Sequence, residues 1–388
     1  MPDKYFTGDS TTPVDSEYIP EVNSPATMAE GDSYYSKTEI ALQKPLASRR
    51  IARRIRQFRP IIMCVALFSV AIIGNLNAQL TGSVAVSTEW TDNAFQLSEQ
   101  DLSRFEHESP TMDFVKTSDD LNLSTRIELA YPLHYRWWKV TPSVIANLAQ
   151  NVSNTEKYRR DSTFKLRIDR YYWNASALYT YNPYIYYRNF ADNDGTGESE
   201  KYSYSRDVYR ADIAIKPLKN TTISGTIRLE DYRYNEFFTE ADGQAITGGL
   251  GFSYRMPISD LDAEYSFRSF TNDNQVDSDD SSYDSNIYKG KLTLPKMRLS
   301  DGGKTKWQPS LGLAYEQRYY QGSGSWYGGR ADYTYTLSTG FKLLFSPVWN
   351  LSLDYSHIYR NVESDNAALL LSKEYSENRL SATMKFKF

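Results

Sequence analysis

The sequence predicts an all-β fold, a closed up-and-down antiparallel transmembrane barrel of about fourteen strands, with a range of twelve to sixteen. Three observations predict it. Segments with alternating apolar and polar residues recur from residue 79 onward, the connections between them alternate between long and short, and the last segment ends on an aromatic residue.

Fourteen segments carry the alternation. It is clearest in the first, where Leu80, Val84, Val86 and Trp90 share one side of a period-two pattern. In chain order the predicted strands are 80–91, 121–133, 138–150, 163–170, 173–187, 202–216, 221–234, 245–256, 261–270, 285–294, 307–319, 331–345, 351–359 and 375–388. Because an open sheet edge in lipid would leave backbone groups unpaired, strands with one lipid-facing side must close on themselves.

The connections support the same architecture. Odd-numbered strands are followed by long polar connections, such as 92–116, 189–201, 272–282 and 361–373. Even-numbered strands are mostly followed by tight turns, such as 132–136, 217–220, 257–260 and 346–349. Two segments are exceptions, because 296–306 is a longer turn on the inner side and 321–325 is a short outer loop. This alternation is typical of barrels with short turns on one side of a membrane and long loops on the other.

Composition agrees with a barrel and excludes a helical membrane protein. Mean hydropathy is -0.59, as expected when only alternate strand residues face lipid. The chain has 32 tyrosines, which suit the aromatic girdles at the two membrane interfaces. The expected girdle residues are Trp137, Trp138, Tyr171, Tyr172, Trp173, Tyr184, Tyr186, Tyr187, Tyr319 and Tyr320.

The front of the chain predicts export. A basic segment precedes an uncharged apolar run at 61–73, which is short for a membrane span, so we expect residues 49–78 to be an export signal cleaved after Ala78. An uncleaved inner-membrane anchor is the alternative. Residues 1–48 are polar and without periodicity, which predicts a disordered extension, or a start codon placed too early. The barrel then occupies residues 79–388.

The last nine residues, LSATMKFKF, place Phe386 and Phe388 on one side of the final strand. This ending resembles the closing strand of Gram-negative outer-membrane β-barrels of the porin type. The resemblance implies that a barrel-assembly machinery recognises Phe386 and Phe388, and that the protein resides in the cell outer membrane.

Charged residues on the polar side of the strands are expected to face the lumen. Fourteen are basic and nine acidic. They are Arg126, Glu128, Lys165, Arg167, Asp169, Arg210, Asp212, Lys216, Arg228, Glu230, Asp262, Glu264, Arg268, Lys289, Lys291, Glu316, Arg318, Asp332, Lys342, Asp354, Arg360, Lys385 and Lys387. One interpretation is a water-filled passage with charged walls. The alternative is that the charges pair across strands and close the interior.

The pattern and the resemblance together predict a porin-like channel for passive diffusion of small hydrophilic solutes. A non-conducting structural, adhesive or export-accessory barrel acting through its outer loops is the alternative, and a hydrolase is a third. Ser356 and His357 are neighbours on a strand and point to opposite faces, so they cannot form a catalytic dyad. The sequence indicates no cofactor, no metal site and no nucleic-acid partner.

Overall fold

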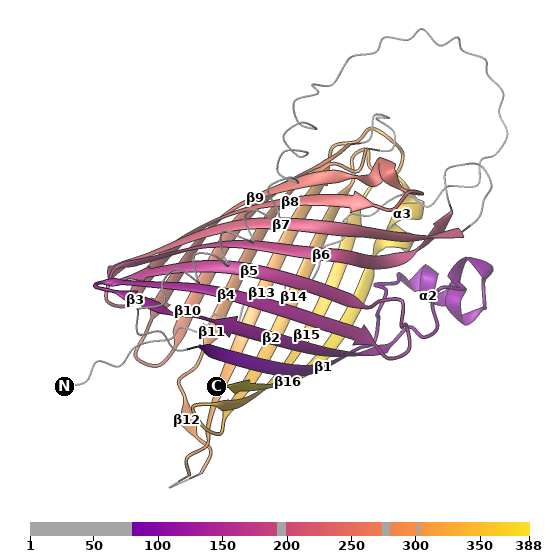
Figure 1. Cartoon of the computed structure of the whole chain (residues 1–388). Helices are drawn as coiled ribbons and strands as arrows, with labels where there is room; N and C mark the ends of the chain where they lie inside the picture. The colour runs from indigo at the N-terminus through magenta and orange to yellow at the C-terminus, as the bar shows by residue number, and fades with distance from the viewer. Residues whose placement is uncertain (1–79, 192–198, 274–279, 301–302) are drawn as a thin grey trace, which may run out of the picture.

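The computed structural model describes residues 80–191, 199–273, 280–300 and 303–388, which form a closed antiparallel barrel (Figure 1). Within these residues the barrel has fourteen strands, as predicted. They are β1 (Thr81–Thr91), β2 (Asp120–Ala130), β4 (Trp138–Asn151), β5 (Arg159–Arg170), β6 (Trp173–Ala191), β7 (Ser199–Leu218), β8 (Thr221–Tyr234), β9 (Gly243–Arg255), β10 (Asp260–Asn272), β11 (Tyr283–Thr293), β13 (Lys306–Tyr320), β14 (Ala331–Leu344), β15 (Trp349–Glu363) and β16 (Tyr375–Lys387). The predicted extension at 1–48 and export signal at 49–78 lie outside the described residues.

Closure comes from pairing between the first and last strands. β1 pairs with β16 in register from Ser83 opposite Lys387 to Thr91 opposite Arg379, and β11 pairs with β13. Two short strands, β3 (Leu133–Tyr135) and β12 (Met297–Arg298), lengthen hairpins at one end of the barrel. Every barrel strand therefore has a hydrogen-bonded neighbour on both sides, as a barrel in lipid requires.

The two ends of the barrel differ. At the turn end, β5 and β6 are joined by two residues, Tyr171 and Tyr172. The loop end carries the short helices α2 (Glu99–Glu106) and α3 (Ala367–Lys373) and the 3-10 turns η1 (Pro110–Met112) and η2 (Thr239–Ala241) (Figure 1). None of the helices in the described residues is long and apolar enough to cross a bilayer.

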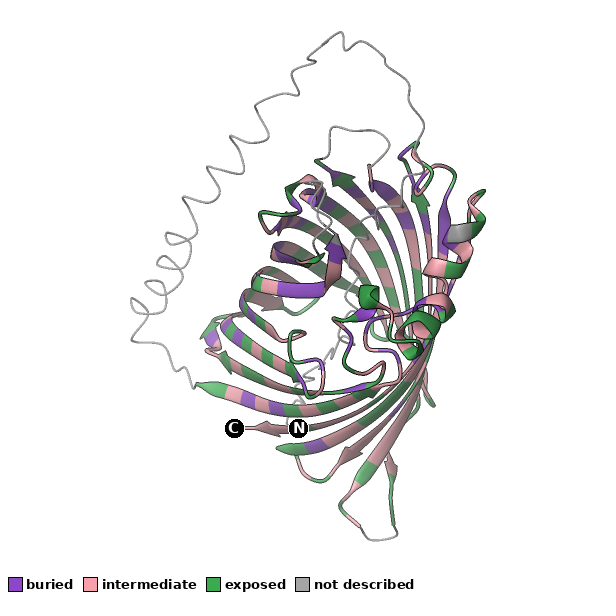
Figure 2. Cartoon of the chain, turned by 90° about the vertical axis from the view of Figure 1, so that its right-hand side faces the viewer, coloured by how far each residue is buried: buried purple, intermediate pink, exposed green. Residues whose placement is uncertain are grey.

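Large apolar side chains cover the outside of the wall. Leu250, Leu313 and Ile227 are among those more than half exposed, and the alternation of exposed and covered residues continues along the strands (Figure 2). On five adjacent strands the outer face carries tyrosines in direct register, with neighbouring ring centroids 4.8 to 6.5 Å apart. These are Tyr265, Tyr288, Tyr315, Tyr335 and Tyr359. This surface matches the lipid-facing side that the sequence predicts.

The expected girdle is wrong for three tyrosines. Tyr186, Tyr187 and Tyr320 are buried rather than exposed to lipid. In β6 the register shifts at two places, between Asn182 and Ile185 and between Tyr186 and Arg188. Simple alternation therefore does not predict which face of the sheet the residues after each shift occupy. Tyr320 follows the inward side of β13. At the turn end, Trp137, Tyr171 and Tyr172 are exposed, as expected.

Candidate functional site

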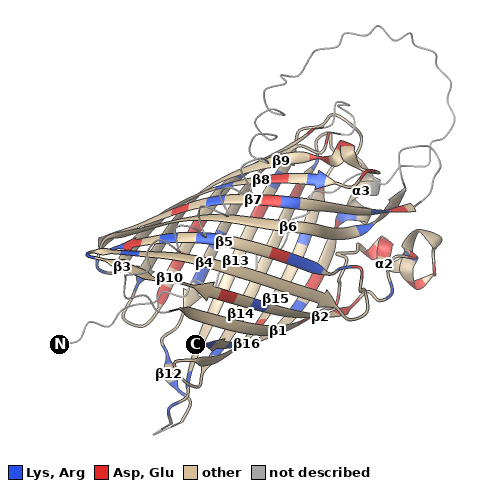
Figure 3. Ribbon diagram, in the orientation of Figure 1, with Lys and Arg blue, Asp and Glu red and all other residues tan. Residues whose placement is uncertain are grey.

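The strand register defines which residues face the lumen. Arg126 of β2 lies opposite Ala85 of β1 and Asn147 of β4. Ala85 in turn lies opposite Lys385 of β16, so Arg126 and Lys385 share one face of the sheet. Followed around the barrel, this register places the charged residues predicted from the sequence on the face opposite the exposed leucines. Lys216 lies at the end of β7, beyond its last regular pair with β6. Figure 3 shows these charges distributed along the strands.

One buried network surrounds Glu230. Arg228 donates from Nη2 to Glu230 Oε1 over 2.9 Å, Arg268 donates to Oε2, and Arg206 Nη1 lies 3.6 Å from Oε1. Tyr232 donates its hydroxyl to Glu230 Oε1 over 3.1 Å and accepts from Arg268 Nη2 over 2.8 Å. A carboxylate with no exposed side-chain surface needs such partners, because burying an unpaired charge is costly.

A second network surrounds Asp332. Arg330 makes a two-pronged contact with it, from Nε to Oδ1 over 2.9 Å and from Nη2 to Oδ2 over 3.0 Å. Arg360 also donates to Oδ2, and Arg318 Nη1 lies 3.9 Å from it. Tyr320 donates its hydroxyl to Oδ2 over 3.1 Å. Both networks join several strands from inside, β7, β8 and β10 around Glu230 and β13, β14 and β15 around Asp332.

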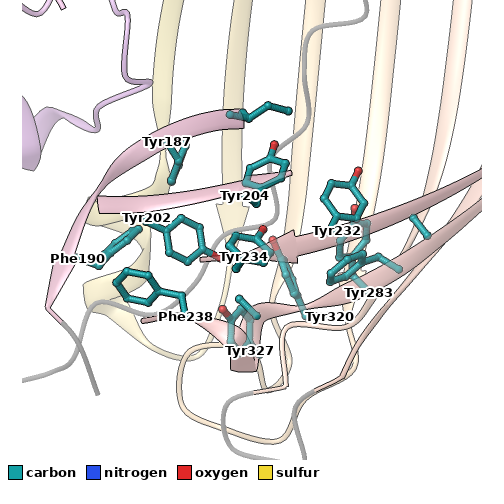
Figure 4. Close-up of a cluster of buried hydrophobic side chains, with 14 residues drawn as sticks. Tyr187, Phe190, Tyr202, Tyr204, Tyr232, Tyr234, Phe238, Tyr283, Tyr320 and Tyr327 are labelled. Carbon is teal, nitrogen blue, oxygen red and sulfur yellow. The ribbon is translucent and has the colours of Figure 1, made fainter. Parts of the chain in front are cut away.

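A tyrosine cluster lies against these networks at the loop end (Figure 4). We use this name for Ile185, Tyr187, Phe190, Tyr202, Tyr204, Tyr232, Tyr234, Phe238, Ala241, Ala245, Phe270, Tyr283, Tyr320 and Tyr327. Tyr202 packs against Phe190, Tyr234 and Phe238 with ring centroids 4.6 to 5.2 Å apart. Arginines cover rings at its edge, with Arg318 Cζ 4.7 Å from the Tyr283 centroid. The cluster fills interior space beside β6 to β13.

The first loop, residues 92–119 with α2, contacts both sides of the loop end. On one side, Asn93 donates from Nδ2 to the Ser376 carbonyl over 3.1 Å. On the other, Arg188 of β6 donates to the Phe95 carbonyl over 3.4 Å and lies 3.5 Å from the Asp101 carboxylate. β16 and β6 are separated by β1, β2, β4 and β5 around the barrel. The loop therefore bridges strands that are not neighbours in the barrel.

The buried and the accessible charged residues of the interior differ in net charge. Of the predicted lumen residues, Arg268, Arg318, Arg360, Glu230 and Asp332 are buried, which leaves eleven basic and seven acidic residues with accessible surface. With the further buried groups, which are Arg206, Arg330, Asp101, Asp120, Asp161, Asp207 and Glu377, the described residues include five buried arginines and seven buried carboxylates. The buried charges thus have a small acidic excess, and the accessible ones are mainly basic.

Sequence reasoning missed several inward charges. Arg206, Glu377, Arg379 and Glu89 lie within predicted strands and on their polar side, so the alternation could have found them. Arg159 and Asp161 precede the predicted start of their strand at residue 163, because that start was placed four residues late. Their pairing with Ala149 and Asn147 of β4 shows that β5 begins earlier.

Ser356 and His357 do lie on opposite faces. Ser356 pairs in register with the inward Ser338, while His357 Nδ1 lies 3.0 Å from Asn378 Oδ1 on the outer side. The two residues therefore do not form a nucleophile and base pair.

Comparison with solved structures found chains that are similar to this one. The chain is similar to a structure titled the outer membrane channel DcaP of Acinetobacter baumannii, with 12% identity over 80% of this chain and 97% of that chain and a TM-score of 0.46. It is similar to a bacterial polysaccharide outer membrane secretin, with 9% identity over 79% and 98% and a TM-score of 0.46. An anion-selective porin from Comamonas acidovorans matches with 9% identity over 80% and 99% and a TM-score of 0.41. No family model and no curated protein matches the sequence.

Proposed function

We propose that the protein is a porin-like channel of a Gram-negative-type outer membrane, through which small hydrophilic solutes diffuse passively. The observation that carries this proposal is the inward face, where eleven basic and seven acidic of the predicted residues keep accessible surface. Charged side chains with accessible surface favour a hydrated interior. About eight strands make a barrel that side chains alone can fill, and this barrel has fourteen.

The outer face supports a location in lipid. Its apolar residues and outward tyrosines suit hydrocarbon and its interfaces. The partners we propose are outer-membrane lipid, the barrel-assembly machinery acting on Phe386 and Phe388, and the diffusing solutes. We propose no catalytic activity and no cofactor.

Conductance tests the proposal. The protein is purified from outer membranes in detergent and added to a planar lipid bilayer, with a detergent blank and an unrelated refolded barrel of known conductance as controls. We expect discrete conductance levels. Persistent silence from protein that circular dichroism shows to be β-rich would contradict a channel.

A non-conducting barrel is the second candidate, and one observation favours it. The tyrosine cluster and the first loop both occupy the loop end, and Tyr202 and Tyr283 have no exposed surface. A plugged barrel that acts through its loops would show this filling too. The two candidates differ in the loop-released variant Arg188→Ala, which should conduct more than the parent if the loop narrows a channel and should stay silent if the barrel is plugged.

A further inference from the structure

We infer that the lumen prefers anions, so that small carboxylates and inorganic anions are its preferred solutes; this rests on the proposed channel function. The first step is that the buried charges do not cancel the basic excess of the accessible ones. Five buried arginines and seven buried carboxylates leave an acidic excess of two, which is smaller than the accessible basic excess, and the networks around Glu230 and Asp332 hold opposite charges within about 4 Å of each other. At the distance of a solute on the lumen axis, paired charges produce little net potential.

The second step is the excess among accessible residues. Ion pairs such as Arg210 with Asp212 at 2.8 Å and Lys289 with Glu264 at 3.9 Å join some of them, but pairing leaves the sum unchanged. Eleven basic against seven acidic residues give a net positive wall, and Lys139, Arg159 and Arg379 against Glu89 increase the difference. A cleft lined by one sign of charge concentrates the opposite ion.

The third step locates the residues that matter most. Arg126 and Lys165 lie on regularly paired strands, and their register neighbours are uncharged. Arg126 lies between Ala85 and Asn147, and Lys165 lies between Ser143 and Leu178. Arg126 is exposed and donates to Asn147 Oδ1 over 3.4 Å. Removing these two charges lowers the positive sum without disturbing the buried networks or the final strand.

The anion preference should depend on the salt concentration. The Debye length is about 10 Å at 0.1 M and about 3 Å at 1 M, so charges on the wall influence the whole lumen only in dilute salt. Anion preference should therefore be strong in dilute KCl and weak in concentrated KCl.

The experiment measures the zero-current voltage of the full-length protein in a planar bilayer under a KCl gradient. We expect chloride to be several-fold more permeant than potassium. The variant Arg126→Gln with Lys165→Gln should lower this ratio, and Glu264→Gln with Asp354→Asn should raise it. Lys304→Gln, in the exposed turn before β13, removes a charge outside the lumen and should leave the ratio unchanged.

The outcomes separate the two proposals. Absence of conductance would overturn the channel function and this inference with it. Conductance in which potassium is as permeant as chloride, or more so, would overturn the anion preference alone. A chloride-to-potassium permeability ratio that is the same in the two lumen variants would overturn it too. Circular dichroism and resistance to unfolding in sample buffer show whether each variant has folded, so a changed ratio cannot come from misfolded protein.

Discussion

The ring of Phe388 lies directly over Gly82, so that a Cβ atom at residue 82 would come 2.5 Å from Phe388 Cζ. The two residues also exchange backbone hydrogen bonds, from Gly82 N to the Phe388 carbonyl over 2.9 Å and from Phe388 N to the Gly82 carbonyl over 3.0 Å. Phe388 stacks on Phe386 at 5.9 Å between centroids. The terminal aromatic residues thus belong to the seam that closes the barrel.

Gly82→Ala should weaken this seam. The added methyl group would push the Phe388 ring away, at a cost of about 1–3 kcal/mol for overpacking. We expect less folded barrel in outer membranes, measured as the fast-migrating fraction of unheated protein on gels, and a lower unfolding temperature, measured by heating samples to increasing temperatures before the gel. Gly290→Ala is the control, because a Cβ there meets nothing within 4 Å. Equal folding of the two variants would show that the close approach at Gly82 is unimportant.

Glu230→Gln should destabilise the barrel strongly. Arg206, Arg228 and Arg268 would lose the carboxylate that they share, and breaking a buried ion pair typically costs about 3–5 kcal/mol. Urea unfolding in lipid vesicles measures the change. Glu264→Gln is the matched control, since Glu264 is half exposed and its removal should cost about 1 kcal/mol or less. Similar losses in both variants would contradict a structural role for the network.

Arg188→Ala should release the first loop. It removes two polar contacts between the loop and β6, to the Asp101 carboxylate and to the Phe95 carbonyl. We expect larger or noisier single-channel currents. Arg104→Ala serves as control, because Arg104 lies 3.3 Å from the same Asp101 but within the loop itself. If both variants conduct like the parent, the tether to β6 does not restrict the lumen.

Stability should depend on pH through Asp242, in the connection between η2 and β9. Burial raises its pKa from 3.8 to about 6, although Tyr234 N donates to its Oδ1 over 2.7 Å. Because the folded state then binds the proton more tightly than the unfolded state, stability is fully present below about pH 4 and falls as pH rises through about 6. Asp242→Asn keeps the acceptor oxygen and removes the titration. The unfolding temperature of the parent relative to this variant should fall between pH 4 and 7, and parallel curves would refute the assignment.

The fold and the facing of most lumen residues could be predicted because a strand has only two faces. Once Leu166 is assigned to lipid, Lys165 and Arg167 must face inward. The same logic fails where the backbone departs from regular pairing, as at Tyr186 and Tyr187 beyond the shifts in β6. Such bulges depend on packing against distant groups and carry no local signal.

Contacts between distant segments were also beyond prediction. Arg188 and Asp101 are far apart in sequence and meet only because the first loop folds back onto β6. Alternation likewise places Glu230 on the inner face without indicating which arginines will surround it. The site was therefore predictable as a set of inward residues, whereas its division into buried networks and accessible wall was not.

The pairing of β1 with β16 has a consequence for biogenesis. Gly82 and Phe388 exchange the last backbone hydrogen bonds of this pairing, so the final hydrogen-bonded pair joins residues from the two extremes of the barrel sequence. Until β16 has emerged, β1 has no partner on that side and β15 is likewise unpaired, and each exposed edge can pair with another chain. The sheet can close only after synthesis has reached its last strand. The chain must therefore be kept apart from its own copies throughout its transit to the membrane.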